Sequence, residues 1–448
     1  MEPTVFSLHL HVAATHRKSL SPVFVLCSPL SNFSANERKA RYAFVVAEAY
    51  ERNLLLAQHG LNKRLGTYSI TRYGDESVKA FIPPPLPPAP PVQLDSFQQL
   101  LEQANQALGR LDGLASILPD LSLFIYTYVR KEAVLSSQIE GTQSSLSDLL
   151  MYENNEVPAV PIVDVQEVSN YVAAMNHGLA RLRGGFPLSL RLIREIHGVL
   201  LAGGRGGEKQ PGEFRTSQNW IAGTRPGNAA FVPPPPERLI ECLHHFELFL
   251  HEDRPELPTL VKAGLIHVQF ETIHPFLDGN GRLGRLLITL LLCQRQALRE
   301  PILYLSLYLK THRSVYYQLL DRVRSAGDWE AWLDFFLRGV KETSEQAAEA
   351  ARQIVSLFDE HQRQIQTLGR PAASVLRVFQ HLQRNPSVTI PATAEKTGVS
   401  APTVAKSLAH LRQSGIVTEK TGRERNRLFV YEAYLKILNE GTATLPRG

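Results

Sequence analysis

The sequence predicts a mainly α-helical protein that ends in a small α+β module, and three patterns support this fold class. Leucine and alanine recur every three or four residues over 96–118, which is the spacing of one helix face. Further helices are expected at 237–251 and 257–272. Near the C-terminus, two helical segments on either side of Gly398 precede two strand-like segments that flank a basic tip.

Length and composition place the chain among ordinary globular proteins. Its 448 residues suggest about three domains of ~150 residues each. With 44% hydrophobic and 20% charged residues, the composition is neither that of a disordered nor that of a fibrous protein. The apolar run at 286–293 is far shorter than the roughly 20 residues that a membrane-spanning helix requires, so no membrane partner is expected.

The cysteines indicate a reduced protein. Cys27, Cys242 and Cys293 lie far apart, with no CxxC pair and no histidine at ligand spacing. Neither a disulfide framework nor a zinc site is therefore expected. We expect a cytoplasmic protein with free thiols.

Positive charge is concentrated at the C-terminal end. The whole chain has a net charge of +5, whereas residues 371–448 hold eleven Lys/Arg against five Asp/Glu. The preceding residues are therefore close to neutral. This asymmetry predicts a C-terminal module that meets polyanions.

Three stretches rich in proline or glycine interrupt the helices. The prolines at 81–91 favour a polyproline II conformation, which suits a ligand for an SH3-like groove or, as we prefer, a stiff strap along its own domain. The GGRGG stretch at 203–207 lacks the spacing of a phosphate loop and is interpreted as a flexible connector. A turn signal between two short apolar stretches predicts a β-hairpin at 218–231.

Glu140 stands at an unusual place, at the end of the helix expected over 122–141. The following Gly141 is a natural helix stop, so the carboxylate lies where the helix dipole is negative. Ser136 lies four residues earlier and shares its helix face. Glu140 is either a solvated side chain at a frayed end or a functional group that pairs with a cation.

The stretch HPFLDGNGRLGR at 274–285 combines groups that suit a polyphosphate site. Glycines around an asparagine, placed just before a helix, present backbone N–H groups to one point and so form an anion seat. Arg282 and Arg285 lie three residues apart and add positive charge for a polyphosphate. Asp278 offers a hard oxygen for Mg²⁺, and His274 titrates near neutrality, which suits proton removal from an attacking hydroxyl. The combination predicts phosphoryl-type transfer.

The same stretch resembles the Fic family signature, HxFx(D/E)GNGRxxR, at every specified position. The resemblance extends over about residues 66–345 and includes the stretches EAVLSSQIEGTQSSLSDLL and PGEFRTSQNWI. It implies a helical Fic core with a β-hairpin flap, which registers a target segment by strand addition. It also implies a protein adenylyltransferase that moves AMP from ATP to a Ser, Thr or Tyr hydroxyl of a protein.

The resemblance also implies roles for individual residues. His274 would be the general base and Asp278 the Mg²⁺ ligand. The remaining residues would bind nucleotide: Phe276 as a buried anchor of the loop, Gly279, Asn280 and Gly281 around the α-phosphate and its neighbour, Arg282 and Arg285 at the β- and γ-phosphates, and Tyr316 at the adenine.

Ser136-x-x-x-Glu140-Gly141 resembles the inhibitory motif of the family, (S/T)xxxE(G/N). The resemblance implies that Glu140 pairs with Arg285 and keeps the γ-phosphate out of its productive position. The chain is therefore expected to be an autoinhibited enzyme.

The C-terminal module resembles a winged helix-turn-helix. Ser400 is the expected N-cap of its second helix. Thr403, Lys406 and Ser407 would face a major groove. Three arginines of the basic tip would reach phosphates: Arg423, Arg425 and Arg427. Winged helices also contact proteins, so duplex DNA and a protein both stay open as its partner.

Five regions are expected along the chain. They are an N-terminal extension of uncertain status at 1–65, a helical region with the inhibitory motif at 66–155, the Fic core at 156–345, a linker helix at 346–370 and the winged helix at 371–438. Other functions stay open: removal of AMP, transfer of another group such as UMP or phosphate, and a DNA-binding regulator with an idle Fic core. The intact Gly279-Asn280-Gly281 argues against kinase-like variants. The target protein and a homodimer are likewise left open.

Overall fold

The computed structural model describes residues 63–74, 76–115, 121–153, 160–254, 256–422 and 427–443. The first strands are β1 (Thr67–Tyr73) and β2 (Glu76–Ile82). The helical core then contains η2 (Leu94–Phe97), α2 (Gln98–Ala115), α3 (Leu121–Ile139), α4 (Leu146–Glu153), α5 (Ile162–Arg183), α6 (Leu190–Leu200), η3 (Pro226–Asn228), α7 (Pro236–His251), α8 (Thr259–Ile273), α9 (Asn280–Gln294), α10 (Ser306–Thr311), α11 (Arg313–Ala326) and α12 (Trp329–Gln366). The C-terminal elements are α13 (Ala372–Arg384), β3 (Ser387–Thr389), α14 (Ile390–Thr397), α15 (Ala401–Gln413), β4 (Thr418–Glu419), β5 (Leu428–Val430) and α16 (Glu432–Asn439). The predicted mainly α fold class is confirmed.

Helices α8 and α9 form the centre of the core. Every residue of α8 from Leu260 to Ile273 is buried, which marks a helix enclosed on all sides. Gly264 lets α12 approach α8 closely, and Trp332 Nε1 on α12 donates a hydrogen bond to its carbonyl at 2.9 Å. The connection between α8 and α9 is thereby held between two fixed helices.

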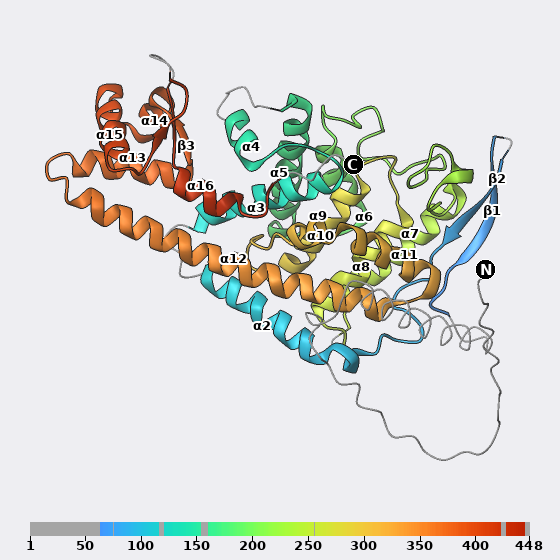
Figure 1. Cartoon of the computed structure of the whole chain (residues 1–448). Coiled ribbons are helices and arrows are strands. Elements are labelled where there is room, and N and C mark those ends of the chain that lie inside the picture. The colour runs from blue at the N-terminus through green and yellow to red at the C-terminus, as the bar shows by residue number, and fades with distance from the viewer. Residues whose placement is uncertain are drawn as a thin grey trace, which may run out of the picture. The chain divides into compact units, whose positions relative to one another are not determined.

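Helix α12 links the core to the C-terminal module. It packs along α2 and continues without a break through the expected boundary at 345–346 (Figure 1). Its buried residues include large aromatic side chains near its start and alanines farther on, such as Ala347 and Ala351. The linker helix expected at 346–370 is therefore the second half of a longer core helix.

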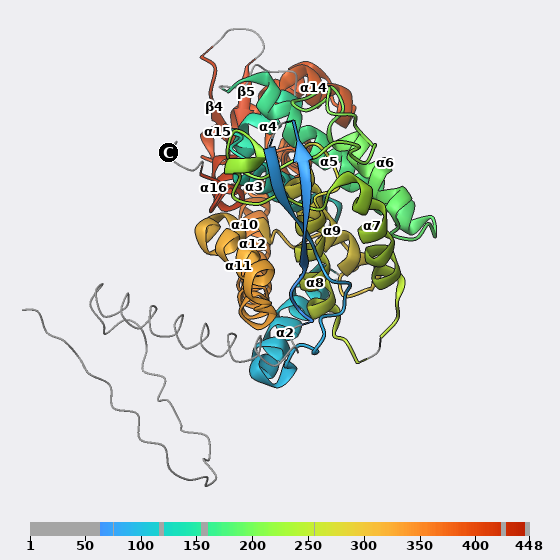
Figure 2. The same ribbon diagram turned by 90° about the vertical axis from the view of Figure 1, so that its right-hand side faces the viewer.

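The β1–β2 hairpin lies beside the region of the expected flap (Figure 2). Phe81 N on β2 donates to Val232 O at 2.9 Å. Within 218–231, the predicted hairpin is reduced to one antiparallel bridge, Ile221 to Phe231, with η3 at its tip. Proline and glycine in this stretch limit ladder formation.

The proline-rich stretch behaves as a strap on its own domain. Gln269 on α8 donates to Pro84 O at 2.9 Å, and Arg64 donates to Pro90 O at 2.8 Å. Two of its peptide bonds, Leu86–Pro87 and Ala89–Pro90, are cis.

The C-terminal module has the predicted winged-helix arrangement. Helix α14 ends at Gly398 in the left-handed conformation (φ 67°), and Ser400 is the N-cap position of α15. The strands form a sheet of order β3-β5-β4. Ser407, expected to face a groove, is instead only 1% exposed, so this part of the prediction is wrong.

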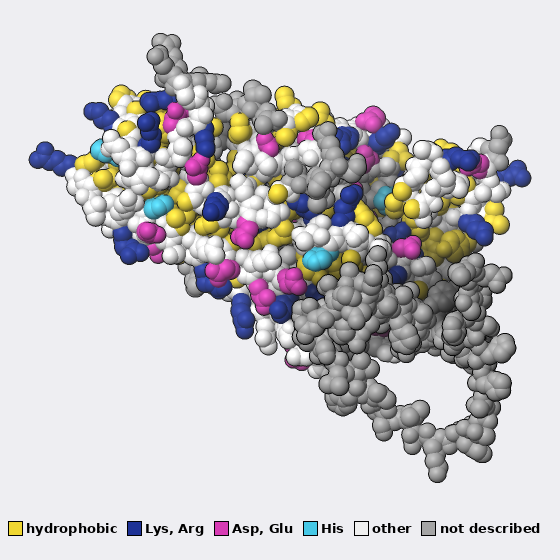
Figure 3. All heavy atoms as spheres, in the orientation of Figure 1, with side chains coloured by type: hydrophobic (Ala, Val, Ile, Leu, Met, Phe, Trp, Pro, Cys, Tyr) yellow, Lys and Arg dark blue, Asp and Glu magenta, His cyan; other side chains and the backbone are white. Residues whose placement is uncertain are grey.

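The surface of the described residues is mixed in charge. Basic and acidic side chains are interspersed on the face drawn in Figure 3. Arg423 and Arg425 of the basic tip, Cys27 and the extension expected at 1–65, apart from residues 63–65, lie outside the described residues. Cys242 and Cys293 are free. Within the described ranges, no helix combines the length and apolarity that crossing a bilayer requires.

Candidate functional site

The segment joining α8 to α9, residues 274–279, is here called the α8–α9 loop. It opens with His274 in the left-handed region (φ 49°), which turns the chain away from α8. Arg215 fixes this turn, because its Nε donates to His274 O at 2.9 Å. Asn219 Nδ2 donates to Phe276 O at 2.9 Å. The backbone from which the histidine projects is therefore held by two side chains of the connection between α6 and α7.

Asn280 and Phe276 brace the loop from inside. The Asn280 side chain accepts from Phe276 N at 2.9 Å and donates to Phe276 O at 2.8 Å. Both residues are buried. The amide of Asn280 is thus used for holding the loop, so only its backbone N–H remains directed outward at the start of α9.

His197 on α6 supports the loop, although no sequence pattern singled it out. Its ring stacks on Phe276 with centroids 3.7 Å apart. Its Nδ1 accepts from Gly212 N at 2.8 Å, so its Nε2 carries the proton and donates to Asp278 O at 3.0 Å. Burial lowers the pKa of His197 to about 4, which keeps the ring neutral in this arrangement.

The start of α9 is a concave group of backbone donors. Gly279 takes the left-handed conformation (φ 76°), which lets the chain enter the helix directly from the loop. Leu283 N is the first to find an acceptor in this turn, Gly279 O at 3.0 Å. The N–H groups of Asn280, Gly281 and Arg282 have no acceptor within the helix, which is the geometry of an anion seat.

Arg282 lies under this seat. Its side chain is only 4% exposed, and its Nη1 lies 3.4 Å from Glu167 Oε2. Among the described residues, its Nε and Nη1 have no hydrogen-bond partner. A buried guanidinium with donors left over is suited to an incoming anion.

A cavity of about 200 Å³ opens above these groups. Its lining includes His274, Asp278, Gly281, Glu140 and Arg205. The structure therefore brings together the predicted catalytic, metal-binding, phosphate-binding and inhibitory residues.

The GGRGG stretch contributes to the same cavity. The Arg205 guanidinium lies 3.1 Å from Asp164 Oδ1 and 3.3 Å from Glu167 Oε1, both carboxylates on α5. A Cβ atom at Gly206 would stand 2.7 Å from Asp278 Oδ2. The connector is thus a wall of the site, which its sequence did not reveal.

Residues 136–142, at the end of α3, are here called the α3 turn, and they lie against Arg285. The Arg285 Nε donates to Ser136 Oγ at 2.8 Å, and its Nη2 donates to Ser136 O at 3.0 Å and to Glu140 Oε1 at 2.7 Å. A Cβ atom at Gly281 would overlap Glu140 Oε1. The Glu140 carboxylate therefore stands directly over the first turn of α9.

Glu140 is ionised in this position. Burial raises the pKa of its carboxyl, but Arg285, together with Arg282, outweighs that effect and holds the pKa below its ordinary value. The side chain of Glu140 is 38% exposed, whereas that of Arg285 is 2% exposed. The carboxylate can thus leave toward solvent, whereas the guanidinium is enclosed.

Two further buried carboxyls flank Arg285. Glu132 on α3 accepts from Ser306 N at 3.1 Å, and burial raises its pKa to about 7. Glu271 on α8 lies against Gly284, and burial raises its pKa to about 7 as well. Arg285 therefore stands among three acidic side chains, of which Glu140 alone is exposed.

One ring nitrogen of His274 has no hydrogen-bond partner among the described residues. A carbonyl can only accept, so its Nδ1 donates to Glu271 O at 3.3 Å and its Nε2 is left as a proton acceptor. Burial lowers the pKa of His274 to about 4.

Asp278 lines the same cavity, with its Oδ1 3.7 Å from Arg282 Nη2. Its Oδ1 accepts from Gly279 N at 2.6 Å, and its Oδ2 faces Gly206. In the part of the chain that the structure describes, no three His, Cys, Asp or Glu side chains are grouped as metal ligands. One carboxylate is the share that a protein commonly gives to Mg²⁺ when phosphates supply further oxygens.

The predicted adenine contact, Tyr316, lies deep in the core. It is 1% exposed, and its hydroxyl bonds His267 Nε2 at 2.8 Å. Its neighbour Tyr317 is 40% exposed and is electrostatically coupled to Glu140 and Arg285. The role of Tyr316 stays a prediction, and Tyr317 is an additional aromatic surface that the sequence analysis missed.

Fold and site together define a helical domain that places a histidine and an anion-binding helix start beside one another. Models of the Fic/DOC family N-terminal region and of the Fic/DOC family match residues 98–180 and 187–292, and a winged helix-turn-helix DNA-binding model matches 374–418. The chain belongs to the Fic/DOC family and carries a C-terminal winged helix-turn-helix.

Curated relatives match less than half of the chain. The protein adenylyltransferase Fic of Aedes aegypti is 34% identical over 202 residues, which are 44% of this chain and 37% of that protein. The protein adenylyltransferase Fic of Drosophila grimshawi is 30% identical over 200 residues, 44% of this chain and 38% of that protein. The chain thus spans well under half the length of these relatives. A crystal structure of a Fic family protein from Desulfovibrio desulfuricans matches with a TM-score of 0.50 and 19% identity, covering 78% of this chain and 98% of that one. That likeness shows the fold alone.

Proposed function

We propose that this protein transfers AMP from ATP to a Ser, Thr or Tyr hydroxyl of a protein, and that Glu140 restrains the reaction. The observation that carries the proposal is the position of the Glu140 carboxylate, which bonds Arg285 at 2.7 Å and covers Gly281. An anionic side chain in an anion seat supports the placement of a phosphate there. The relatives named protein adenylyltransferase support ATP as the substrate.

His274 is the proposed general base. Its Nε2 takes the proton of the acceptor hydroxyl as the hydroxyl oxygen attacks the α-phosphorus and pyrophosphate leaves. The bond from Nδ1 to Glu271 O fixes the tautomer that this step requires. The low pKa keeps the ring unprotonated at neutral pH.

The phosphate chain is proposed to lie across the start of α9. Backbone N–H groups of Asn280 and Gly281 hold the α-phosphate and its neighbour, and Arg282 and Arg285 take the outer phosphates. Asp278 would hold Mg²⁺, whose chemistry there is to neutralise phosphate charge. The Oδ2 of Asp278 is faced by Gly206, where a side chain would crowd this oxygen.

Glu140 is proposed to compete with the outermost phosphate for Arg285. Because its side chain is partly exposed, the carboxylate of Glu140 can swing away from Arg285 toward solvent. Restraint is then the difference in free energy between Arg285 paired to Glu140 and Arg285 paired to phosphate.

Labelled ATP tests this function directly. With Mg²⁺ present, the full-length Glu140→Gly variant is expected to modify itself more than the parent does, and mass spectrometry should find added AMP. A His274→Ala change in that variant is expected to lower the rate by roughly 10²–10⁴-fold. If Glu140→Gly shows no gain, the proposed restraint by Glu140 is wrong. If labelling is unchanged by His274→Ala, the proposed role of His274 as general base is wrong.

For the winged helix, we propose duplex DNA as the ligand. The matching model describes DNA binding, and Lys406 on α15 is exposed while Thr403 is half-buried. Binding to duplex DNA should then weaken steeply with added salt, because phosphate contacts release counterions. Affinity that is independent of salt would point to a protein partner.

A further inference from the structure

The chain returns to the helical core after α16, through a segment from Asn439 to Ala443 that we call the C-terminal segment. Asn439 Nδ2 donates to Ser147 Oγ at 3.2 Å. Lys310 Nζ on α10 donates to Gly441 O at 3.4 Å and also to Ala443 O. These bonds tie the end of the winged helix to α4 and α10.

The C-terminal segment is closely fitted into its place. Thr442 is only 3% exposed. Gly441 takes the left-handed conformation (φ 78°), and a Cβ atom there would stand 2.5 Å from Leu307 Cδ1. Only glycine satisfies both the backbone conformation and the close approach.

A fourth bond of the segment reaches the α3 turn itself. Gln138 Nε2 donates to Thr442 O at 3.0 Å and to Ser144 O at 2.9 Å. Gln138 is 2% exposed and lies between Ser136 and Glu140, which both bond Arg285. One buried amide thus links the C-terminal segment to the turn that holds the carboxylate.

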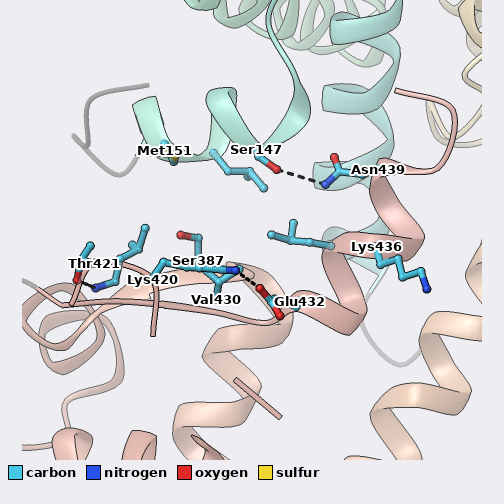
Figure 4. Close-up of a pocket in the computed structure, with 12 residues that line it drawn as sticks. Ser147, Met151, Ser387, Lys420, Thr421, Val430, Glu432, Lys436 and Asn439 are labelled. Atoms are coloured by element: carbon cyan, nitrogen blue, oxygen red, sulfur yellow. Dashed lines mark hydrogen bonds and ion pairs between the residues drawn. The ribbon is translucent and has the colours of Figure 1, made fainter. Parts of the chain in front are cut away.

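Contact between the winged helix and α4 is interrupted by a second cavity, of about 550 Å³ (Figure 4). Met151 lies on its α4 side, with Val430 and Lys420 on the side of the wing, and the bond from Ser147 to Asn439 lies at one end. The wing is therefore separated from α4 at this place, while the C-terminal segment is bonded to it. Helix α4 itself begins at Leu146, soon after the α3 turn.

We propose that the C-terminal segment is a latch that keeps the α3 turn closed, so that its release raises AMP transfer. The inference rests on the proposed function. With the segment seated, the amide of Gln138 spans the turn, and Glu140 is held over Gly281. When the segment leaves, Gln138 loses a buried partner, and the closed turn becomes less favourable relative to the open one.

Gly441→Ala is the sharpest test, because the methyl group would meet Leu307, which does not line the cavity of the candidate site. The matched control is Gly415→Ala, which has a similar backbone conformation (φ 73°) in the winged helix but no neighbour within 4 Å. Self-modification with labelled ATP is expected to rise roughly five-fold in full-length Gly441→Ala. This factor corresponds to the net contribution of about one hydrogen bond. It should stay at the parental level in Gly415→Ala.

A second variant covers the case in which Gly441→Ala does not fold. Lys310→Met keeps the apolar stem of a side chain that is 5% exposed and removes the donors to the segment. It should also raise self-modification. Hydrogen exchange at Gly141 and Thr142 should become faster in both variants without nucleotide, since opening of the turn precedes binding.

Epistasis separates the latch from the proposed function. In a Glu140→Gly background, Gly441→Ala should add nothing, because no carboxylate is left to hold. An equal gain in both backgrounds, or unchanged exchange at the turn, would overturn the latch. If Glu140→Gly itself shows no AMP transfer, the proposed function fails, and the exchange measurement still decides whether the segment holds the turn.

Discussion

The α8–α9 loop and the α3 turn meet at the start of α9, but they are held in different ways. The loop is braced by buried groups on every side, including Asn280, His197 and Arg215. The turn is held by a few long-range bonds to Arg285, Glu167 and Thr442, and its glutamate is partly exposed. In the proposed function, a rigid binding surface thus faces a partly exposed blocking side chain, on a turn whose residues Ser136–Ile139 and Thr142 are themselves buried.

The largest expected effect concerns the α8–α9 loop, and it is a shift in the pKa of His274. Its pKa of about 4, against an ordinary 6.5, corresponds to a roughly 300-fold weaker affinity for a proton. Because the pKa is lowered, the ring should stay neutral as pH falls from 7 to 5, where a free histidine becomes charged. Nuclear magnetic resonance of labelled histidines would measure this, with His274→Ala identifying the signal. A midpoint near 6.5 would mean that the loop is open to water.

Removing the outer support of the loop should have the next largest effect. His197→Phe keeps a ring against Phe276 but loses the bonds to Gly212 N and Asp278 O. In a Glu140→Gly background, AMP transfer should fall roughly 10–100-fold, because small displacements of reacting groups are costly. His251→Phe is the control. His251 lies on α7, and its Nε2 also bonds a backbone carbonyl, Leu188 O. Equal losses in both variants would assign the effect to folding.

In the α3 turn, Ser136→Ala should raise the affinity for ATP moderately. It removes the acceptor of Arg285 Nε, so the guanidinium is held less firmly toward α3 and ATP should bind roughly five-fold more tightly. Ser137→Ala is a close control, because its hydroxyl is also buried but has no hydrogen-bond partner among the described residues. Calorimetric titration with ATP would show the difference, and an equal response of the two would contradict it.

Arg205 should give the smallest effect, because it is 56% exposed and partly exposed ion pairs contribute little. Arg205→Ala leaves Asp164 and Glu167 with less positive charge beside the phosphate seat, so ATP affinity should fall about two- to three-fold. Arg191→Ala, which removes a more exposed pair with Glu195, should leave the affinity unchanged. A loss of more than tenfold for Arg205→Ala would place this arginine on the phosphate itself.

Much of the fold and the site could be predicted because the signals were local. Helix starts and ends followed from spacing and from residues such as Gly398 and Ser400, and residues 274–285 stood together in the sequence. Glu140 could be predicted as a paired residue because a carboxylate at the C-terminal end of a helix is stabilised by a nearby cation.

What could not be predicted depends on tertiary contacts. His197 looks like any helical histidine until the loop folds against it, and Arg205 sits in a glycine-rich stretch that gives no register. Ser407 was placed on the wrong face because hydroxyls are common at both groove and core positions of a short helix. Strand pairing within 218–231 likewise depends on tertiary contacts, such as the bond from Phe81 N to Val232 O, which the local sequence does not reveal.

The absence of a side chain at Gly281 limits which mutations the protein can tolerate. The missing side chain that opens the first turn of α9 to an anion also admits the carboxylate of Glu140. In the proposed function, a larger residue there would crowd both, so a change at this position would relieve the proposed restraint only by weakening nucleotide binding. Suppressors that switch the enzyme on should therefore accumulate in α3 and its contacts, and leave the glycine untouched.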